Sequence, residues 1–192
     1  MNKTKRARTS LSAIGAVLLG AALAGCETTS TPSASSAAES RAAPVTATAQ
    51  LKPTQGNTAA GTVSFTQQGL RVDVRVQVTG LTPNQEHGFH VHEKGDCSAP
   101  DASSAGAHFN TTGTKHGARE HMSAHTGDMG NIVADDSGKA HDEYVDTKMK
   151  LEGDSSVIGK AVIVHEKTDD QVTQPTGNSG NRVACGVIQA AK

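Results

Sequence analysis

Histidines are concentrated in one part of this 192-residue chain. Seven of the nine lie between His87 and His125. Neutral imidazole nitrogens are common ligands for zinc and for copper. This density of histidines indicates a metal site in the middle of the chain.

Two patterns in the sequence could supply histidine ligands from strands. His90 and His92 flank one valine, and residues two apart on a strand share a face, so both rings can reach one ion. In isolation this pattern is more typical of paired surface histidines. His165 ends the apolar run 161–164, where it fits a packed or capping residue as well as a ligand.

A second set of ligand types lies in a glycine-rich segment. It comprises His108, His116, His125 and Asp128. Three imidazoles and a carboxylate suit zinc, which is normally four-coordinate in structural sites. Glycines let the backbone curl around an ion, although loop histidines are also often simply solvated.

The elements that must position these residues are predicted to be strands. One period-two alternation places the following side chains on a buried face: Leu70, Val72, Val74, Val76 and Val78. Further strands are predicted over 61–67, 88–93, 131–134, 160–165 and 183–189, with a turn at 68–69. We therefore predict an all-β fold, an eight-stranded antiparallel Greek-key barrel or sandwich of immunoglobulin-like type. The segments 94–130 and 166–182 are predicted to be long functional loops.

The N-terminal segment resembles a bacterial export signal. Residues 1–25 contain basic residues followed by an apolar run over 11–23, which is too short to span a bilayer. The run leads into Leu-Ala-Gly-Cys at 23–26, which is similar to a lipobox with Cys26 as the acylated residue. An ordinary signal peptide followed by a chance cysteine is the alternative. We expect an exported protein of the cell envelope (periplasm), held at a membrane by the lipid anchor at Cys26.

Composition separates the rest of the chain into two parts. Residues 26–48 are rich in Ser, Ala, Thr and Pro and are predicted to be a flexible tether, and residues 49–192 are predicted to fold. Without residues 1–25 the chain has 14 basic and 19 acidic residues, a net charge of −5. This balance argues against nucleic acid as a partner. In an oxidising compartment Cys97 and Cys185 are expected to form a disulfide.

Several motifs together resemble the copper,zinc superoxide dismutase family. In order and spacing they are Gly-Phe-His-Val-His-Glu at 88–93, Ser-Ala-Gly-Ala-His-Phe-Asn at 104–110, Lys-His-Gly at 115–117, His-Thr-Gly-Asp at 125–128, Val-His-Glu at 164–166 and Gly-Asn-Arg-Val-Ala-Cys-Gly-Val-Ile at 180–188. The similarity covers residues 49–192.

The resemblance implies a role for each ligand type. It implies one copper ion held by His90, His92, His108 and His165, and one zinc ion held by His108, His116, His125 and Asp128. His108 would bridge the two ions and take up a proton during catalysis. Asp169 would link a copper histidine to a zinc histidine, His87 would support the copper site, and Arg182 would receive the anion.

The implied activity is the disproportionation of superoxide to dioxygen and hydrogen peroxide by Cu(II)/Cu(I) cycling, which would protect the cell envelope. The alternative is a non-enzymatic lipoprotein that binds copper or zinc. The resemblance leaves a monomer and a homodimer both open. Because the segment 171–177 is uncharged, substrate attraction is expected to rest on Arg182, with Lys115 or Arg119.

Overall fold

Alternating burial organises β3 (Arg71–Thr79) in the computed structural model, which describes residues 43–191. The four valines of this strand face the core and the residues between them face outward. Leu70 does not belong to the buried set, because it lies in the two-residue turn after β2 (Ala60–Gln68) and is 77% exposed. Gly69 opens this turn with a φ of 60°, which glycine adopts without strain.

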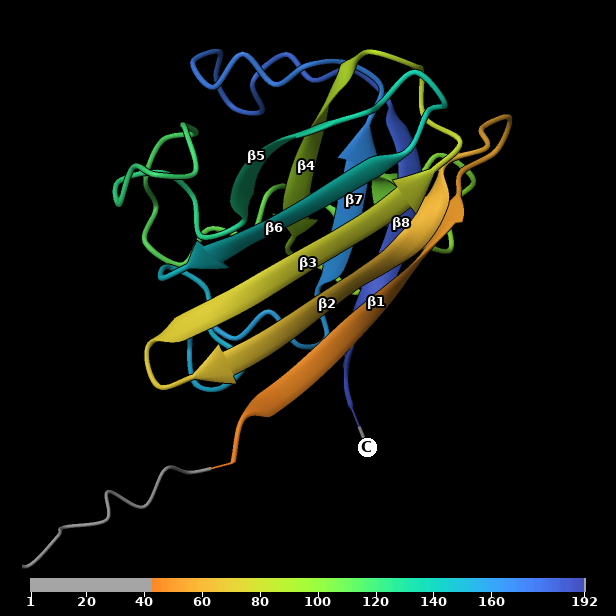
Figure 1. Ribbon diagram of the computed structural model, residues 1–192. Helices are drawn as coiled ribbons and strands as arrows, with labels where there is room; N and C mark the ends of the chain where they lie inside the picture. Colours follow the sequence, from red (N-terminus) through yellow and green to blue (C-terminus); the bar gives the residue numbers. More distant parts are fainter. Residues whose placement is uncertain (1–42, 192) are drawn as a thin grey trace, which may run out of the picture. The chain divides into compact units, whose positions relative to one another are not determined.

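The strands form one continuous antiparallel sheet that curls into a nearly closed barrel (Figure 1). The remaining strands are β1 (Val45–Pro53), β4 (Glu86–His92), β5 (Asp128–Val133), β6 (Ala140–Asp146), β7 (Ala161–His165) and β8 (Arg182–Ala190). Their order is β5-β4-β7-β8-β1-β2-β3-β6, and β5 and β6 at its two ends approach each other. Because β3 pairs with β6 and β4 pairs with β7, the chain crosses over between neighbours, and the predicted eight-stranded antiparallel barrel is confirmed.

Two of the eight strands were not located from the sequence. β1 begins at Val45, so the ordered sheet starts before the predicted boundary at residue 49. Its core-facing residues include Ala47 and Ala49, which carry little hydrophobic signal. β6 was not predicted because two acidic residues, Asp142 and Asp146, lie on the same face of the strand as Tyr144, so that face shows little hydrophobic pattern.

β7 is buried on both of its faces. Val162 and Val164 belong to the main core inside the barrel. Ala161 and Ile163 face the other way and pack with Cys185 and the loop that follows β4. The first long loop is thereby held against the outside of the barrel.

Both long loops end at a strand that begins with a predicted site residue. The first connects β4 to β5, which begins at Asp128, and the second connects β7 to β8, which begins at Arg182. A short 3-10 turn, Ser103–Ala105, is the one helical element in residues 43–191, and no helix in that range has the length and apolar character to cross a membrane. The predicted signal segment 1–25 and Cys26 lie outside the described residues.

Candidate metal centre

Four histidines converge where β4, β7 and the first long loop meet. They are His90, His92, His108 and His165, which we call the four-histidine group. Each offers a ring nitrogen, and these nitrogens lie within 4.8 Å of one another. All four residues are buried, with at most 5% of their surface exposed.

Strand geometry explains how this group assembles. On β4 the residues Phe89 and Val91 point into the core, so His90 and His92 share the opposite face. β7 runs antiparallel beside β4 and brings its terminal histidine to the same region. An isolated antiparallel β-bridge between His92 and His108 brings the first long loop back beside β4.

Three of these rings are oriented by a hydrogen bond from one nitrogen, which leaves the other nitrogen free. Carbonyl and carboxylate oxygens accept, so the bonded ring nitrogen carries the proton. The bonds join His92 Nδ1 to Gly106 O (2.8 Å), His165 Nδ1 to Gly180 O (3.2 Å) and His90 Nε2 to Asp169 Oδ2 (2.8 Å). The remaining nitrogens are His92 Nε2, His165 Nε2 and His90 Nδ1.

These remaining nitrogens are buried without a hydrogen-bond partner. Within residues 43–191, seven buried side-chain N or O atoms lack a partner, and four of them are one nitrogen from each member of the four-histidine group. Buried polar atoms are nearly always paired, so this concentration calls for a common explanation. Burial also lowers the pKa of His90, and lowers those of His92 and His165 well below the usual value, so these rings are neutral at pH 7. Four imidazoles that each leave one buried nitrogen without a partner fit a copper ion.

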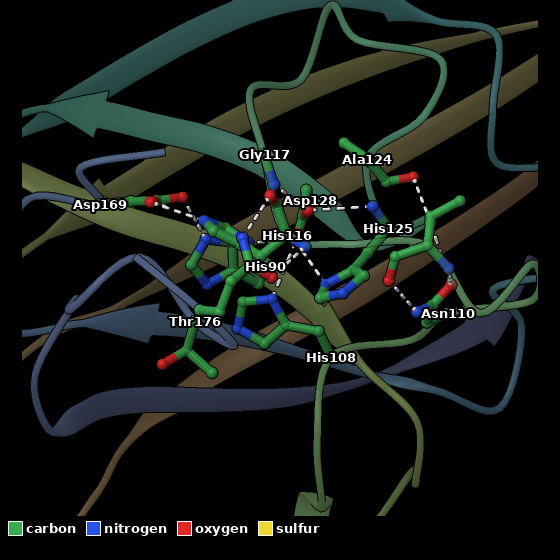
Figure 2. Close-up of polar contacts among 12 residues, drawn as sticks. His90, His108, Asn110, His116, Gly117, Ala124, His125, Asp128, Asp169 and Thr176 are labelled. Carbon is green, nitrogen blue, oxygen red and sulfur yellow. Dashed lines mark hydrogen bonds and ion pairs between the residues drawn. The ribbon is translucent and has the colours of Figure 1, made fainter. Parts of the chain in front are cut away.

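The second set forms around one carboxylate oxygen, Asp128 Oδ1 (Figure 2). The Nδ1 atoms of His108, His116 and His125 lie 2.8, 3.0 and 3.2 Å from it. The other oxygen, Oδ2, accepts the backbone N–H groups of Gly117 and His125, each at 3.0 Å. Three nitrogens and one oxygen at such spacings fit tetrahedral zinc, whose bonds are about 2.0–2.2 Å. We call these four residues the Asp128 group.

His108 belongs to both groups. Its Nδ1 faces Asp128 and its Nε2 is the unpartnered nitrogen of the four-histidine group. Burial lowers its pKa to about 4, although the hydrogen bond with Asp128 acts in the opposite direction. The ring therefore has one nitrogen on each side, and it would have to lose its remaining N–H proton to serve an ion on both sides, because a neutral imidazole has only one free lone pair.

Asp169 connects the two groups from the second loop. Its Oδ2 accepts from His90 Nε2 at 2.8 Å and its Oδ1 accepts from His116 Nε2 at 2.9 Å. Burial by itself would lower the pKa of His116, but the hydrogen bonds to Asp128 and Asp169 outweigh it and raise that pKa to about 9. The carboxylate thus sets the orientation of one ring in each group.

Sequence reasoning missed the residues that hold these positions. Asn131 brackets the Asp169 backbone, donating to its carbonyl at 2.9 Å and accepting its N–H at 2.7 Å. Gln174 brackets His116 in the same way, with both bonds at 2.9 Å. Gly177 has no room for a Cβ, which would overlap Asp169 Oδ1. The only sequence signal for these residues was their position within or beside the predicted loops.

Arg182 is aimed by backbone carbonyls of the first long loop. Its guanidinium donates to Ala102 O and Gly106 O, each at 2.6 Å, and burial lowers its pKa. That loop is tied to β8 by the predicted Cys97–Cys185 disulfide, which the structure contains with a Cα–Cα distance of 5.8 Å. The side chain is therefore held near the four-histidine group, since Gly106 O also accepts from His92.

Other basic and histidine residues are placed differently. His87 is buried and its Nδ1 donates to His165 O at 2.7 Å, so it supports the backbone of a four-histidine residue. His121 and His141 are exposed. Arg119 stacks on the Tyr144 ring at 3.9 Å, with Glu120 and Asp142 at 3.5 and 3.6 Å, so its charge is already matched.

The fold and the two ligand groups together define a β-barrel protein with two adjacent, buried clusters that could each hold a metal ion. Residues 59–188 match the family described as copper/zinc superoxide dismutase (SODC). The chain belongs to the copper/zinc superoxide dismutase family. It therefore has superoxide dismutase activity, an oxidoreductase reaction that uses copper and zinc and takes superoxide as substrate.

Two known superoxide dismutases and one solved structure are similar to this chain over most of its length. The chain is 45% identical over 138 residues to a Cu-Zn superoxide dismutase of Paramecium bursaria Chlorella virus 1, covering 69% of this chain and 73% of that protein. It is 42% identical over 164 residues to an extracellular Cu-Zn superoxide dismutase of Drosophila melanogaster, covering 80% and 90%. A crystal structure of the clock protein EA4 superposes with a TM-score of 0.71 and 42% identity, covering 78% of this chain and 97% of that one.

Proposed function

We propose that the four-histidine group holds the copper ion and that the Asp128 group holds the zinc ion. The observation that carries the assignment is the set of four buried, unpartnered ring nitrogens, one from each member of the four-histidine group. When bound, copper supplies one-electron chemistry by alternating between Cu(II) and Cu(I), which zinc cannot supply.

The chain's own residues then have separate tasks. His108 Nε2 would hold and release a proton for peroxide formation only while it is not serving as a ligand, because one ring nitrogen cannot do both and Nδ1 of the same ring faces Asp128. Arg182 attracts and orients the superoxide anion, since a guanidinium stays charged and offers several donors. Asp169 keeps the rings of His90 and His116 in place during turnover.

The test of the copper assignment is a variant that touches the four-histidine group alone. His165→Ala should lose copper and dismutase activity while zinc stays bound. The reason is that Asp128 pairs with His108, His116 and His125 but not with His165. His141→Ala is the matched control, since His141 is exposed on β6. Metal analysis and a superoxide decay assay on both variants give the answer. Full copper occupancy and activity in His165→Ala would contradict the assignment.

We also propose that the enzyme is exported and anchored in the cell envelope, where it protects against superoxide. Support comes from the signal-like segment 1–25, the Leu-Ala-Gly-Cys sequence at 23–26 and the tether-like composition that follows. The fly relative is named as an extracellular enzyme. These features favour an envelope enzyme of the bacterial lipoprotein type.

The anchor is tested by changing one residue outside the domain. Cys26→Ser should move the protein from the membrane pellet to the soluble fraction with unchanged specific activity, because no acyl chain would remain. Ser30→Ala, a neighbouring change, should leave it in the pellet. A Cys26→Ser protein that still sediments with membranes would rule out this attachment.

A further inference from the structure

A cavity of about 540 Å³ opens beside His108, the residue that both ligand groups share. Its wall also includes Thr176 from the second loop and His125 from the first. Two lysines, Lys94 and Lys160, line it against a single acid, Glu93. The cavity thus combines access to a ligand histidine with a local excess of positive charge.

Lys160 is fixed at this cavity by its surroundings. It immediately precedes β7, and its backbone N–H donates to Val157 O at 3.0 Å while its carbonyl accepts from Ile188 N–H at 2.9 Å. Its Nζ lies 4.9 Å from the centre of the Phe109 ring, next in sequence to His108. A cation over an aromatic face is held in place while keeping its charge.

No neighbouring acid forms an ion pair with Lys160 in the described residues. In the described part of the chain Lys160 makes no ion pair within 4.0 Å. Glu93, the acid on the same wall, turns its Oε1 toward the backbone N–H of Ala107 at 3.3 Å. Lys160 therefore presents a free positive charge to an anion that enters the cavity.

The other candidates for attracting superoxide differ from Lys160. The segment 171–177 contains no charged residue, and the charge of Arg119 is matched by Glu120 and Asp142. Lys115 is exposed, but it does not line this cavity. Residues 26–192 carry a net charge of −5, so the field of the whole protein opposes an incoming anion. A local cation near the metal site is needed to offset it.

We propose that Lys160 guides superoxide through this cavity toward the four-histidine group, with Lys94 as a second, more exposed charge at the same wall. The inference rests on the proposed copper site, because guidance requires a destination. Lys160 is not itself a catalytic residue, and it acts separately from Arg182, which does not line this cavity. It supplies positive charge close to the site, which the uncharged segment 171–177 does not supply.

The effect must depend on salt. Charges interact across about 10 Å at 0.1 M ionic strength but only about 3 Å at 1 M. Lys160→Gln should therefore lower the bimolecular rate with superoxide by roughly two- to fivefold at low salt, and the difference should vanish near 1 M. Lys160→Arg, which keeps the charge and can still stack on Phe109, should retain the wild-type rate.

The matched control is Lys139→Gln, which makes the same change in net charge elsewhere. Lys139 lies in the turn after β5, at the opposite end of that strand from Asp128. Pulse radiolysis over a salt series, with metal content measured for each sample, compares the variants. The inference is overturned if Lys160→Gln is as fast as wild type at low salt, or no slower than Lys139→Gln.

Azide binding to the copper-loaded protein gives a readout independent of turnover. As a small anion it should bind Lys160→Gln more weakly than wild type at low salt, with equal affinity at 1 M. If wild type gives no azide-dependent change in copper absorbance, the proposed copper site itself fails. If wild type responds and Lys160→Gln responds identically, the copper site stands and the guiding role of Lys160 is wrong.

Discussion

The ligand histidines use their two ring nitrogens for different purposes. In His90, His92 and His165 one nitrogen donates to an oxygen and the other is left for the ion. The donated bond fixes the tautomer and the rotation of the ring before any metal arrives. His108 differs, because each of its nitrogens faces one ligand group.

If the Asp128 group holds zinc as proposed, removal of His116 should affect one metal and not the other. His116→Ala takes a nitrogen from the Asp128 group without touching the four-histidine group directly, so zinc affinity should fall by more than about 100-fold while copper still binds. His121→Ala, a change in the same loop at an exposed position, should retain both metals. Elemental analysis after dialysis measures both ions. Zinc retained at full occupancy in His116→Ala would refute its place in the site.

The sequence was most informative at this scale. The resemblance to the superoxide dismutase motifs grouped the copper-type ligands, whereas residue type alone left His165 open as a packed or capping residue. Residue type did suggest the zinc-type set and the Cys97–Cys185 pair, since imidazole, carboxylate and thiol chemistry are properties of single residues. Asn131 and Gln174 were not predictable, because their side-chain amides act through hydrogen bonds to backbone groups that are distant in sequence. A single sequence does not show which backbone groups lie close together in the fold.

At the scale of elements, the two long loops are locked to each other through the ligand residues. Gln174 in the second loop holds the backbone of His116 in the first, and Asp169 contacts the ring of the same histidine. The uncharged segment 171–177 therefore contributes order to the Asp128 group through Gln174.

Loss of the Gln174 bracket should loosen both loops together. Gln174→Ala removes two hydrogen bonds to His116, and zinc affinity should fall about tenfold, as for other partners that orient a ligand. Amide hydrogen exchange should rise in 111–125 and in 171–177. Gln77→Ala, an exposed change on β3, should alter neither property. Unchanged zinc affinity together with unchanged exchange would show that the bracket is not needed.

Strand prediction succeeded where the inner face is made of large apolar residues. The valines of β3 gave a clear alternation, and only the exposed Leu70 was assigned to the wrong face. β1 has mainly alanines on its inner face and β6 has aspartates, so their period-two pattern carries little hydrophobic contrast. Their partners in the sheet, rather than their own residues, determine that they are strands.

One covalent link joins the first long loop to the barrel in residues 43–191. The Cys97–Cys185 disulfide spans 88 positions and fastens the first long loop to β8. The same loop supplies both carbonyls that hold Arg182. The disulfide and the orientation of the Arg182 side chain are therefore linked through this loop.

Removing the disulfide should weaken both the stability of the domain and the orientation of Arg182. The double variant Cys97→Ala/Cys185→Ala should lose roughly 4–5 kcal/mol of unfolding free energy in the chain-entropy model, and its activity should drop as the Arg182 carbonyls become mobile. Urea unfolding of the metal-free protein measures the first effect. Cys26→Ser serves as the control and should leave the unfolding free energy unchanged. A loss below about 1 kcal/mol would show that the link adds little.

The most direct measurement for the whole account is anomalous X-ray diffraction from crystals of the metal-loaded protein, collected on both sides of the copper and zinc absorption edges. We predict one copper peak bounded by His90 Nδ1, His92 Nε2, His108 Nε2 and His165 Nε2. A separate zinc peak should lie among the Nδ1 atoms of His108, His116 and His125 and Asp128 Oδ1. Copper found in the Asp128 group alone, or no metal among the four histidines, would contradict the account.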